Sequence, residues 1–135
     1  MKIKIIVHTL ITNNGEVLLI QRSKNVTNLP EYWDIPGGSL KRGEDPTSGA
    51  VREALEETSL EIRKPKLYFS YSNSDKTKNM HFITLVYRAE VSDKSIMLNP
   101  EEHQDSIWVD MNTALDFVKN NDCPDYLEPA INAMR

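Results

Sequence analysis

The chain has 135 residues, which is the size of one ordinary domain and too short for two. Leu, Ile, Val and Phe make up about a quarter of it, which argues against a disordered chain. Acidic residues outnumber basic ones by 20 to 16, and the net charge of −4 argues against a general electrostatic grip on nucleic acid or on an anionic membrane. An anionic ligand would therefore need positive charge supplied locally.

The first predicted element is a strand over residues 2–12, which is rich in β-branched and apolar side chains. His8 and Thr9 interrupt its apolar run, so we expect a strand and not a secretory signal. Asn13-Asn14-Gly15 separates it from a second apolar run over residues 16–21, a pattern typical of a β-hairpin. Residues 33–36 predict a short strand that stops at Pro36-Gly37-Gly38.

The rest of the chain alternates between helix and strand patterns. Asp45-Pro46 predicts a helix start, and the helix should run to Thr58 or Ser59. Strands are expected at 67–72, 81–90 and 107–109, and helices at 111–119 and 127–134. This order predicts an α+β fold, an α/β/α sandwich with a mixed central sheet, forming one domain over residues 1–135.

Neither a membrane span nor an internal disulfide is expected. No apolar stretch approaches the roughly 18 residues that cross a bilayer. Cys123 is the only cysteine, which favours a reducing compartment, and we expect the cytoplasm.

The helix predicted after Asp45 separates apolar from acidic side chains. At 100° per residue, its three glutamates lie within about 100° of one another. The opposite side carries Val51, Ala54 and Leu55, which we expect to face the core. The acidic side comprises Glu53, Glu56 and Glu57. A solvated acidic face partly neutralised by Arg52 is the simpler interpretation of such a helix taken alone.

The loop before this helix favours a cation site instead. Gly37 and Gly38 lack the Cβ atom that would keep a ligand from the backbone. Glu44 adds one more carboxylate near the helix start. Carboxylate and carbonyl oxygens are the ligands of hard divalent cations, and Mg²⁺ commonly pairs them with substrate phosphates. A bound cation also reverses the local sign of charge, so an acidic protein can hold a polyphosphate.

This segment resembles the signature of the Nudix hydrolase family, G-x5-E-x7-R-E-U-x-E-E-x-G-U, where U is aliphatic. The matching residues are Gly38, Glu44, Arg52, Glu53, Glu56, Glu57 and Leu60. Their joint occurrence by chance is on the order of once in 10⁷ windows or fewer. The flanking strands and closing helices also resemble the α/β/α sandwich of that family.

The chain departs from the family pattern at three positions. Ser59 stands where the signature has glycine, and a left-handed helix end there would cost up to about 1 kcal/mol. Ala54 is smaller than the usual aliphatic residue. Lys41 replaces an acidic residue that is common in this loop.

The resemblance implies a role for each matching residue. Glu53, Glu56 and Glu57, with the Gly37 or Gly38 carbonyl, are the implied ligands of Mg²⁺ or Mn²⁺. Arg52 would orient the carboxylates, and Glu44 would support them. The general base is either a helix glutamate or a glutamate on a distal loop, where Glu102 is the candidate ligand and base. An ordinary acidic turn is the alternative for Glu102.

Substrate contacts are predicted at two more places. Arg22 ends a strand, as a substrate-contacting arginine does in MutT-like proteins, although a solvated arginine is the alternative. Trp33, with Tyr32, would stack on a base unless it belongs to the core. The three histidines are scattered without cysteines, so a zinc site is not expected.

The implied activity is MutT-like hydrolysis of a nucleoside triphosphate to a monophosphate and pyrophosphate. An ADP-ribose or nucleotide-sugar pyrophosphatase is the alternative within the family, and a non-catalytic nucleotide sensor is the alternative outside enzymes. Relatives that cleave ADP-ribose tend to have proline where this chain has Asp75, and dinucleoside polyphosphate hydrolases tend to have tyrosine near Thr77 and Lys78. We expect a small-molecule nucleotide partner and a monomer or homodimer.

Overall fold

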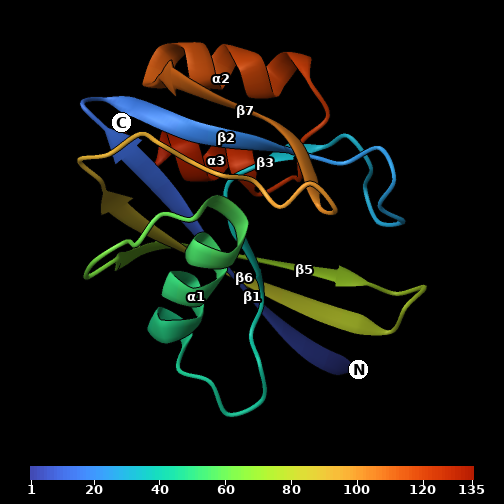
Figure 1. Ribbon diagram of the computed structural model, residues 1–135. Helices are drawn as coiled ribbons and strands as arrows, with labels where there is room; N and C mark the ends of the chain where they lie inside the picture. Colours follow the sequence, from blue (N-terminus) through green and yellow to red (C-terminus); the bar gives the residue numbers. More distant parts are fainter.

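The computed structural model describes residues 1–135 as one seven-stranded mixed sheet with helices on both faces (Figure 1). None of its helices is long and apolar enough to cross a membrane. The elements in chain order are β1 (Lys2–Asn13), β2 (Glu16–Arg22), β3 (Trp33–Asp34), β4 (Gly37–Ser39), α1 (Pro46–Thr58), β5 (Lys66–Asp75), β6 (Met80–Glu90), β7 (His103–Asp110), α2 (Met111–Asn120) and α3 (Leu127–Asn132).

Strand β1 organises the sheet. It pairs in parallel with β6 along most of its length, and β6 pairs antiparallel with the edge strand β5. It also pairs antiparallel with β2 and with the short strand β4, while β2 carries β3 and β7. Asn14 and Gly15 form the two-residue turn between β1 and β2, with φ of 46° and 82°, as the Asn-Gly pair predicts. The predicted mixed sheet is therefore confirmed.

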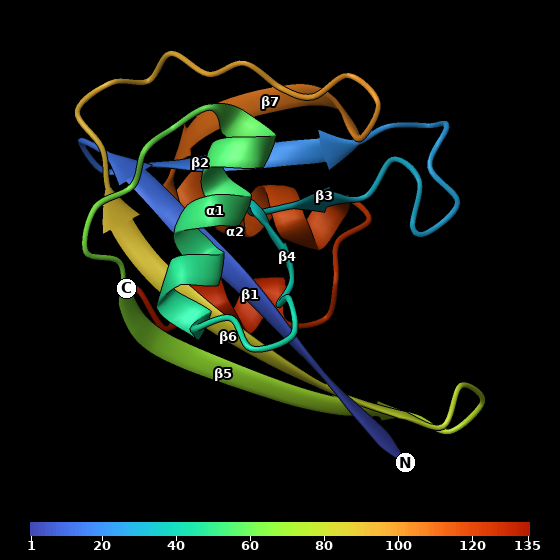
Figure 2. The same ribbon diagram turned by 60° about the horizontal axis from the view of Figure 1, so that its bottom comes forward.

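Alternation along the central strands divides the core into two layers, because successive side chains of a strand point to opposite faces. Figure 2 shows α1 in front of the sheet and α2 behind it. The cluster under α2 and α3 includes Leu10, Val17 and Leu19. The cluster under α1 includes Ile11, Leu18 and Ile20. The α/β/α sandwich predicted from the sequence is therefore confirmed.

Helix α1 presents a different face to the sheet from the one the sequence predicts. Leu55 was expected in the core, but it is 45% exposed. The buried residues of α1 are Gly49, Ala50, Ala54, Glu57 and Thr58. Small residues let the helix backbone lie close to the sheet, so the helix is rotated to bring Glu57 inward and Leu55 outward. The predicted core face was wrong for Leu55 and correct for Ala54.

Other predicted boundaries also need correction. Strands β5 and β7 are longer than expected, because ladder pairing extends each of them through polar residues, while β6 begins one residue earlier, at Met80. The Gly37-Gly38 segment does not merely end a strand; it forms β4 and pairs with β1. Helix α3 ends at Asn132 and not at Met134.

The helix ends follow the predicted capping residues. Asp45 accepts a hydrogen bond from the Ser48 N–H at 3.2 Å, and Asp110 accepts one from the Thr113 N–H at 2.8 Å. Ser59 ends α1 in the left-handed conformation, with φ of 67°, and its N–H donates to the Leu55 carbonyl. The expected cost of serine at this position therefore applies to the observed geometry.

Two glycines of β4 are required by close packing on opposite sides of the strand. A Cβ atom at Gly37 would lie 2.2 Å from the Val7 carbonyl oxygen and 2.4 Å from the His8 ring. A Cβ atom at Gly38 would lie 2.7 Å from a carboxylate oxygen of Glu53. At Gly37, an added Cβ atom would collide with fixed backbone and with a buried ring. At Gly38, it would collide only with the end of a flexible side chain.

Replacing Ser59 with glycine should stabilise the protein. S59G removes the penalty of a left-handed Cβ and should raise the free energy of unfolding by about 1 kcal/mol in urea denaturation. S59A is the matched control, because it removes the hydroxyl but keeps the strained backbone. An equal gain in both variants would contradict this explanation.

Alanine should be far worse at Gly37 than at Gly38. G37A forces the rigid β1 backbone to move and should lower the free energy of unfolding by about 2 kcal/mol or more. G38A should cost less, because the Glu53 carboxylate can swing away. Urea denaturation of both variants measures the difference, and equal losses would show that the two glycines are not distinguished by what they touch.

Candidate active site

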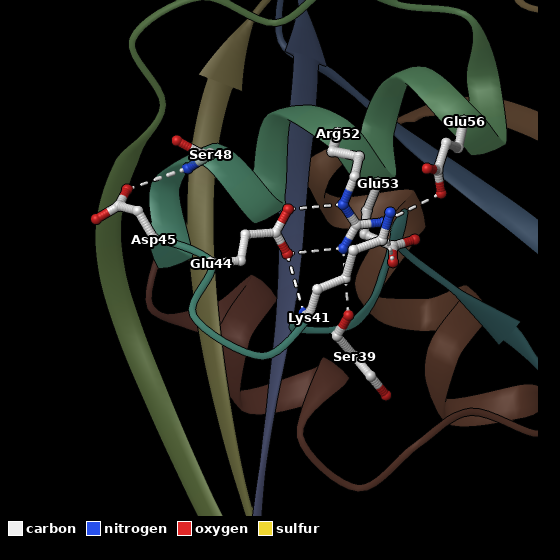
Figure 3. Close-up of polar contacts among 8 residues, drawn as sticks. All are labelled: Ser39, Lys41, Glu44, Asp45, Ser48, Arg52, Glu53 and Glu56. Atoms are coloured by element: carbon white, nitrogen blue, oxygen red, sulfur yellow. Dashed lines mark hydrogen bonds and ion pairs between the residues drawn. The ribbon is translucent and has the colours of Figure 1, made fainter.

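Arg52 links three carboxylates on one side of α1 (Figure 3). Its Nε and Nη2 donate to the two oxygens of Glu44 at 2.7 and 2.9 Å, which is a bidentate pair. Its Nη1 donates to Glu53 at 3.0 Å and to Glu56 at 3.2 Å. Its Nη2 also donates to the Ser39 carbonyl at 3.3 Å, which fastens the group to β4. Arg52 thus contacts the helix carboxylates, and Glu44 contacts Arg52, in the way that the family resemblance implies.

These contacts with Arg52 shift the pKa values of the residues that take part in them. Hydrogen bonds from Arg52 and from the Lys41 N–H lower the pKa of Glu44 to about 2. The same contacts raise the pKa of Arg52, chiefly through Glu44. Burial raises the pKa of Glu53, and the charge of Arg52 opposes that shift. Arg52 therefore favours the ionised form of Glu44 and opposes the effect of burial on Glu53.

Glu57 has different surroundings from the other helix glutamates. It is only 7% exposed, and its Oε1 accepts a hydrogen bond from the Gly37 N–H at 2.8 Å. Burial raises the pKa of its carboxyl to about 9, and the Gly37 hydrogen bond only partly opposes that shift. A positive charge beside this carboxylate would offset the cost of burying it.

The pairing of β4 explains why Gly37 can reach Glu57. The Thr9 N–H donates to the Pro36 carbonyl and the Leu40 N–H donates to the Ile5 carbonyl. Hydrogen-bonded pairs alternate with unbonded pairs in antiparallel strands, so Gly38 faces β1 and Gly37 faces away from it. The backbone of Gly37 is therefore directed toward α1, and its carbonyl is the better placed of the two candidate backbone ligands.

A second group of ligand atoms surrounds Glu57. One ligand atom from each of Glu57, Glu102 and His103 lies within 4.8 Å of the others. Glu102 is exposed in the turn before β7, whereas His103 is 4% exposed and its Nδ1 has no hydrogen-bond partner. Burial and the nearby Arg22 charge lower the pKa of His103 to about 4. The structure thus brings the predicted Glu102 to Glu57.

The three helix glutamates are divided between these two groups. Glu57 faces Glu102 and His103, while Glu53 and Glu56 are bound to Arg52 and lie outside the 4.8 Å group. The side chain of Glu56 is 54% exposed and that of Glu53 is 13% exposed. A cation at Glu57 would have to draw both Glu53 and Glu56 from Arg52 to complete a ligand set of three helix carboxylates.

His103 is the residue that sequence analysis missed. It lies 46 positions after Glu57, and no metal-binding spacing connects the two residues. The only available signal is its position beside the candidate Glu102. The other two histidines contact other groups: the His8 ring contacts the Ile35 carbonyl, and His81 contacts Ser72 on the neighbouring strand.

A cavity of about 670 Å³ opens on the side of β4 that faces away from α1. Gly37 and Gly38 form part of its wall, so this thin strand separates it from the carboxylates. Arg22 lines the cavity and donates from Nε to the Asn28 carbonyl at 2.9 Å. Arg22 also pairs with His103 across β2 and β7, which places the cavity beside the Glu57 group.

Trp33 does not contribute to this cavity. Its side chain is buried and packs edge-on against Phe117, with ring centroids 5.0 Å apart. The predicted stacking of Trp33 on a ligand is therefore wrong, and the alternative of a core aromatic is observed. The neighbouring Tyr32 lines the cavity instead.

The floor of the cavity is polar. Asp34, which is largely buried there, accepts a hydrogen bond from the Tyr126 hydroxyl. His8 donates from Nδ1 to the Ile35 carbonyl at 2.8 Å, and this nitrogen lies 3.9 Å from Asp34. Burial raises the pKa of Asp34, while His8 and Tyr126 oppose that shift. Lys4, Arg22 and Lys78 supply positive charge around the same cavity.

The stability of the protein in acid should depend on Glu44. Its folded pKa of about 2 is below the ordinary glutamate value of 4.5, so its stabilising effect is complete above pH 4.5 and is lost as the pH falls toward 2. E44Q should therefore flatten the fall of stability between pH 4.5 and 2, measured by urea denaturation at each pH. E128Q is the matched control, because Glu128 lies on α3, outside the Arg52 group, and its side chain is 44% exposed. An unchanged slope in E44Q would contradict the prediction.

Comparison with known proteins identifies the fold and the domain. The NUDIX domain model matches residues 2–127. A MutT-like protein of Streptomyces ambofaciens is 32% identical over 82 residues, which are 61% of this chain and 47% of that protein. The chain thus spans about half the length of that relative.

Solved structures agree with this match over nearly the whole chain. The MutT protein of Methanosarcina mazei has a TM-score of 0.83 and 27% identity, and the match covers 97% of this chain and 91% of that one. The NUDIX domain of Shewanella oneidensis NrtR, solved with ADP-ribose, has a TM-score of 0.79 and 18% identity, covering 100% and 87%. The family model, the MutT-like relative and the shared fold together show that this chain belongs to the NUDIX domain family.

Proposed function

We propose that this chain hydrolyses a phosphoanhydride bond in a nucleoside diphosphate derivative, with a divalent cation bound at Glu57. The observation that carries the proposal is the buried Glu57 carboxylate, held by the Gly37 N–H beside Glu102. The site adjoins a cavity of about 670 Å³, which is large enough for a nucleotide. Membership of the NUDIX family supports the same class of reaction.

The residues around Glu57 suit a hard divalent cation. Glu57 and Glu102 offer carboxylate oxygens, and Gly37 offers a backbone carbonyl on the same side of β4. Glu53 and Glu56 are the further candidates and are held nearby by Arg52. Mg²⁺ or Mn²⁺ would neutralise phosphate oxygens and lower the pKa of a bound water.

The reaction needs a base as well as this neutralisation of charge. A water oxygen forms a new bond to phosphorus, the bridging anhydride oxygen leaves with the other phosphate group, and one water proton passes to a carboxylate. Glu102 is the best candidate to accept that proton, because it is the exposed carboxylate of the group. Arg52 would hold Glu53 and Glu56 in position during the displacement.

The cavity supports a nucleotide as the substrate. Lys4, Arg22 and Lys78 supply the local positive charge that a protein of net charge −4 needs for an anionic ligand. Tyr32 offers a ring at the wall for stacking. We propose a nucleoside triphosphate that is cleaved to a monophosphate and pyrophosphate; ADP-ribose and nucleotide sugars are the alternatives. A cytoplasmic location stays a prediction that rests on the single thiol of Cys123.

The first test removes the charge of Glu57. E57Q keeps the shape of the side chain but should lower the rate of Mg²⁺-dependent hydrolysis roughly 100-fold or more, since both cation binding and catalysis depend on the carboxylate. E128Q should keep the wild-type rate. Steady-state phosphate or pyrophosphate release measures both, and a near-normal rate in folded E57Q would contradict the proposal.

A substrate panel separates the three activities. Nucleoside triphosphates, ADP-ribose and nucleotide sugars would each be incubated with the protein and Mg²⁺, with the products identified by mass. We expect a monophosphate and pyrophosphate from at least one triphosphate. Monophosphate products from ADP-ribose alone would favour the pyrophosphatase, and binding without any hydrolysis would favour a sensor and contradict the enzyme.

A further inference from the structure

We propose that His103 provides a nitrogen ligand to the cation at Glu57 and Glu102, so that this site favours borderline transition-metal ions over Mg²⁺. The inference rests on the proposed function, because it concerns the same cation. It goes beyond that function by assigning a role to a residue that lies outside the NUDIX signature. It also names the class of cation that the site selects.

The first support is the placement of the ligand atoms. Donor atoms of Glu57, Glu102 and His103 lie within 4.8 Å of one another. Ligands about 2.0–2.2 Å from one cation lie about 3–4.4 Å from each other, depending on the angle between them. Small side-chain rotations are therefore enough to bring all three donors to one ion.

The backbone around His103 is fixed on both sides, which makes this placement reproducible. The His103 N–H donates to the Asn99 carbonyl at 2.9 Å, and the Ser23 N–H donates to the Glu102 carbonyl at 2.8 Å. His103 is also the first residue of β7 and pairs with Arg22. The turn thus holds Glu102 and His103 against the end of β2 before any cation binds.

The second support is an unpaired buried nitrogen. Three buried side-chain atoms in the chain lack a hydrogen-bond partner, namely Thr9 Oγ1, His103 Nδ1 and Trp108 Nε1. Buried polar atoms are normally paired, so each exception calls for an explanation. Of these three residues, only His103 has a possible ligand atom within 4.8 Å of two carboxylates, those of Glu57 and Glu102. A bound cation accounts for this exception.

The chemistry of the donors then sets the preference for the ion. Carboxylate and carbonyl oxygens suit Mg²⁺ and Mn²⁺, whereas an imidazole suits later transition-metal ions such as Co²⁺ and Ni²⁺. A site with two glutamates and one histidine should therefore bind Co²⁺ more tightly, relative to Mg²⁺, than the same site without the imidazole. His103 is the one histidine in this group, so the site is not made mainly of nitrogen.

The test compares cation affinities in metal-free protein. Calorimetric titrations with Mg²⁺ and with Co²⁺ would be made on wild type, H103Q and the control H81Q, whose histidine lies on β6. H103Q should lose roughly 10–100-fold in Co²⁺ affinity while its Mg²⁺ affinity changes far less. H81Q should keep both affinities.

A second measurement does not depend on how well the variant folds. Pulsed electron paramagnetic resonance of Mn²⁺ bound to the wild-type protein reports a directly bound nitrogen through its hyperfine coupling. We expect coupling to one imidazole nitrogen, and its disappearance in H103Q. Coupling absent from wild type would overturn the assignment.

The outcomes separate this inference from the proposed function. Equal losses of Mg²⁺ and Co²⁺ affinity in H103Q would show that the ring only positions a carboxylate, which overturns nitrogen ligation. Unchanged affinities for both ions would overturn it as well. A wild-type protein that binds neither ion would instead overturn the cation site on which the proposed function depends.

Discussion

The contact between α1 and β4 is the constraint on which the rest of the site depends. The Gly37 N–H donates to Glu57 at 2.8 Å, so a backbone group of the sheet fixes a buried carboxylate of the helix. That contact requires a helix that packs closely, which Gly49, Ala50 and Ala54 permit. It also requires glycine at position 37, since a Cβ atom there would lie 2.2 Å from the Val7 carbonyl oxygen.

The glutamates of the site form two groups, one paired with an arginine and one without a cationic partner. Arg52 pairs with Glu44, Glu53 and Glu56, so each of these carboxylates has a cationic partner within the protein. Glu57 has only a peptide N–H and lies among Glu102 and His103. This buried carboxyl with no cationic partner is therefore the place where an added cation stabilises most, because the cation would offset the cost of ionising Glu57 in the interior.

Local patterns in the sequence predicted most of the fold. Asp45 and Asp110 were predicted as helix caps because an aspartate before a helical pattern satisfies free N–H groups, and both accept the expected hydrogen bonds. The Asn-Gly turn and the alternation of apolar residues in β1 and β2 similarly fixed the hairpin and the two faces of the sheet.

Contacts between distant segments could not be predicted in this way. A helical wheel places Leu55 opposite the glutamates, but the side of α1 that packs against the sheet depends on small residues and on the Gly37 hydrogen bond. The pairing of β4 with β1 and the approach of His103 to Glu57 are likewise long-range events. Trp33 was misassigned because an aromatic residue at a strand start is equally suited to the core or to a ligand.

The most direct test of the account is the position of Mn²⁺ in crystals grown with the ion and a non-hydrolysable nucleotide. Anomalous scattering locates the ion independently of any assumed role. The account predicts one peak at about 2.0–2.2 Å from a Glu57 oxygen, between α1 and the nucleotide phosphates. A nucleotide seated in the cavity with the ion bound elsewhere, and Glu57 still joined only to Gly37, would contradict it.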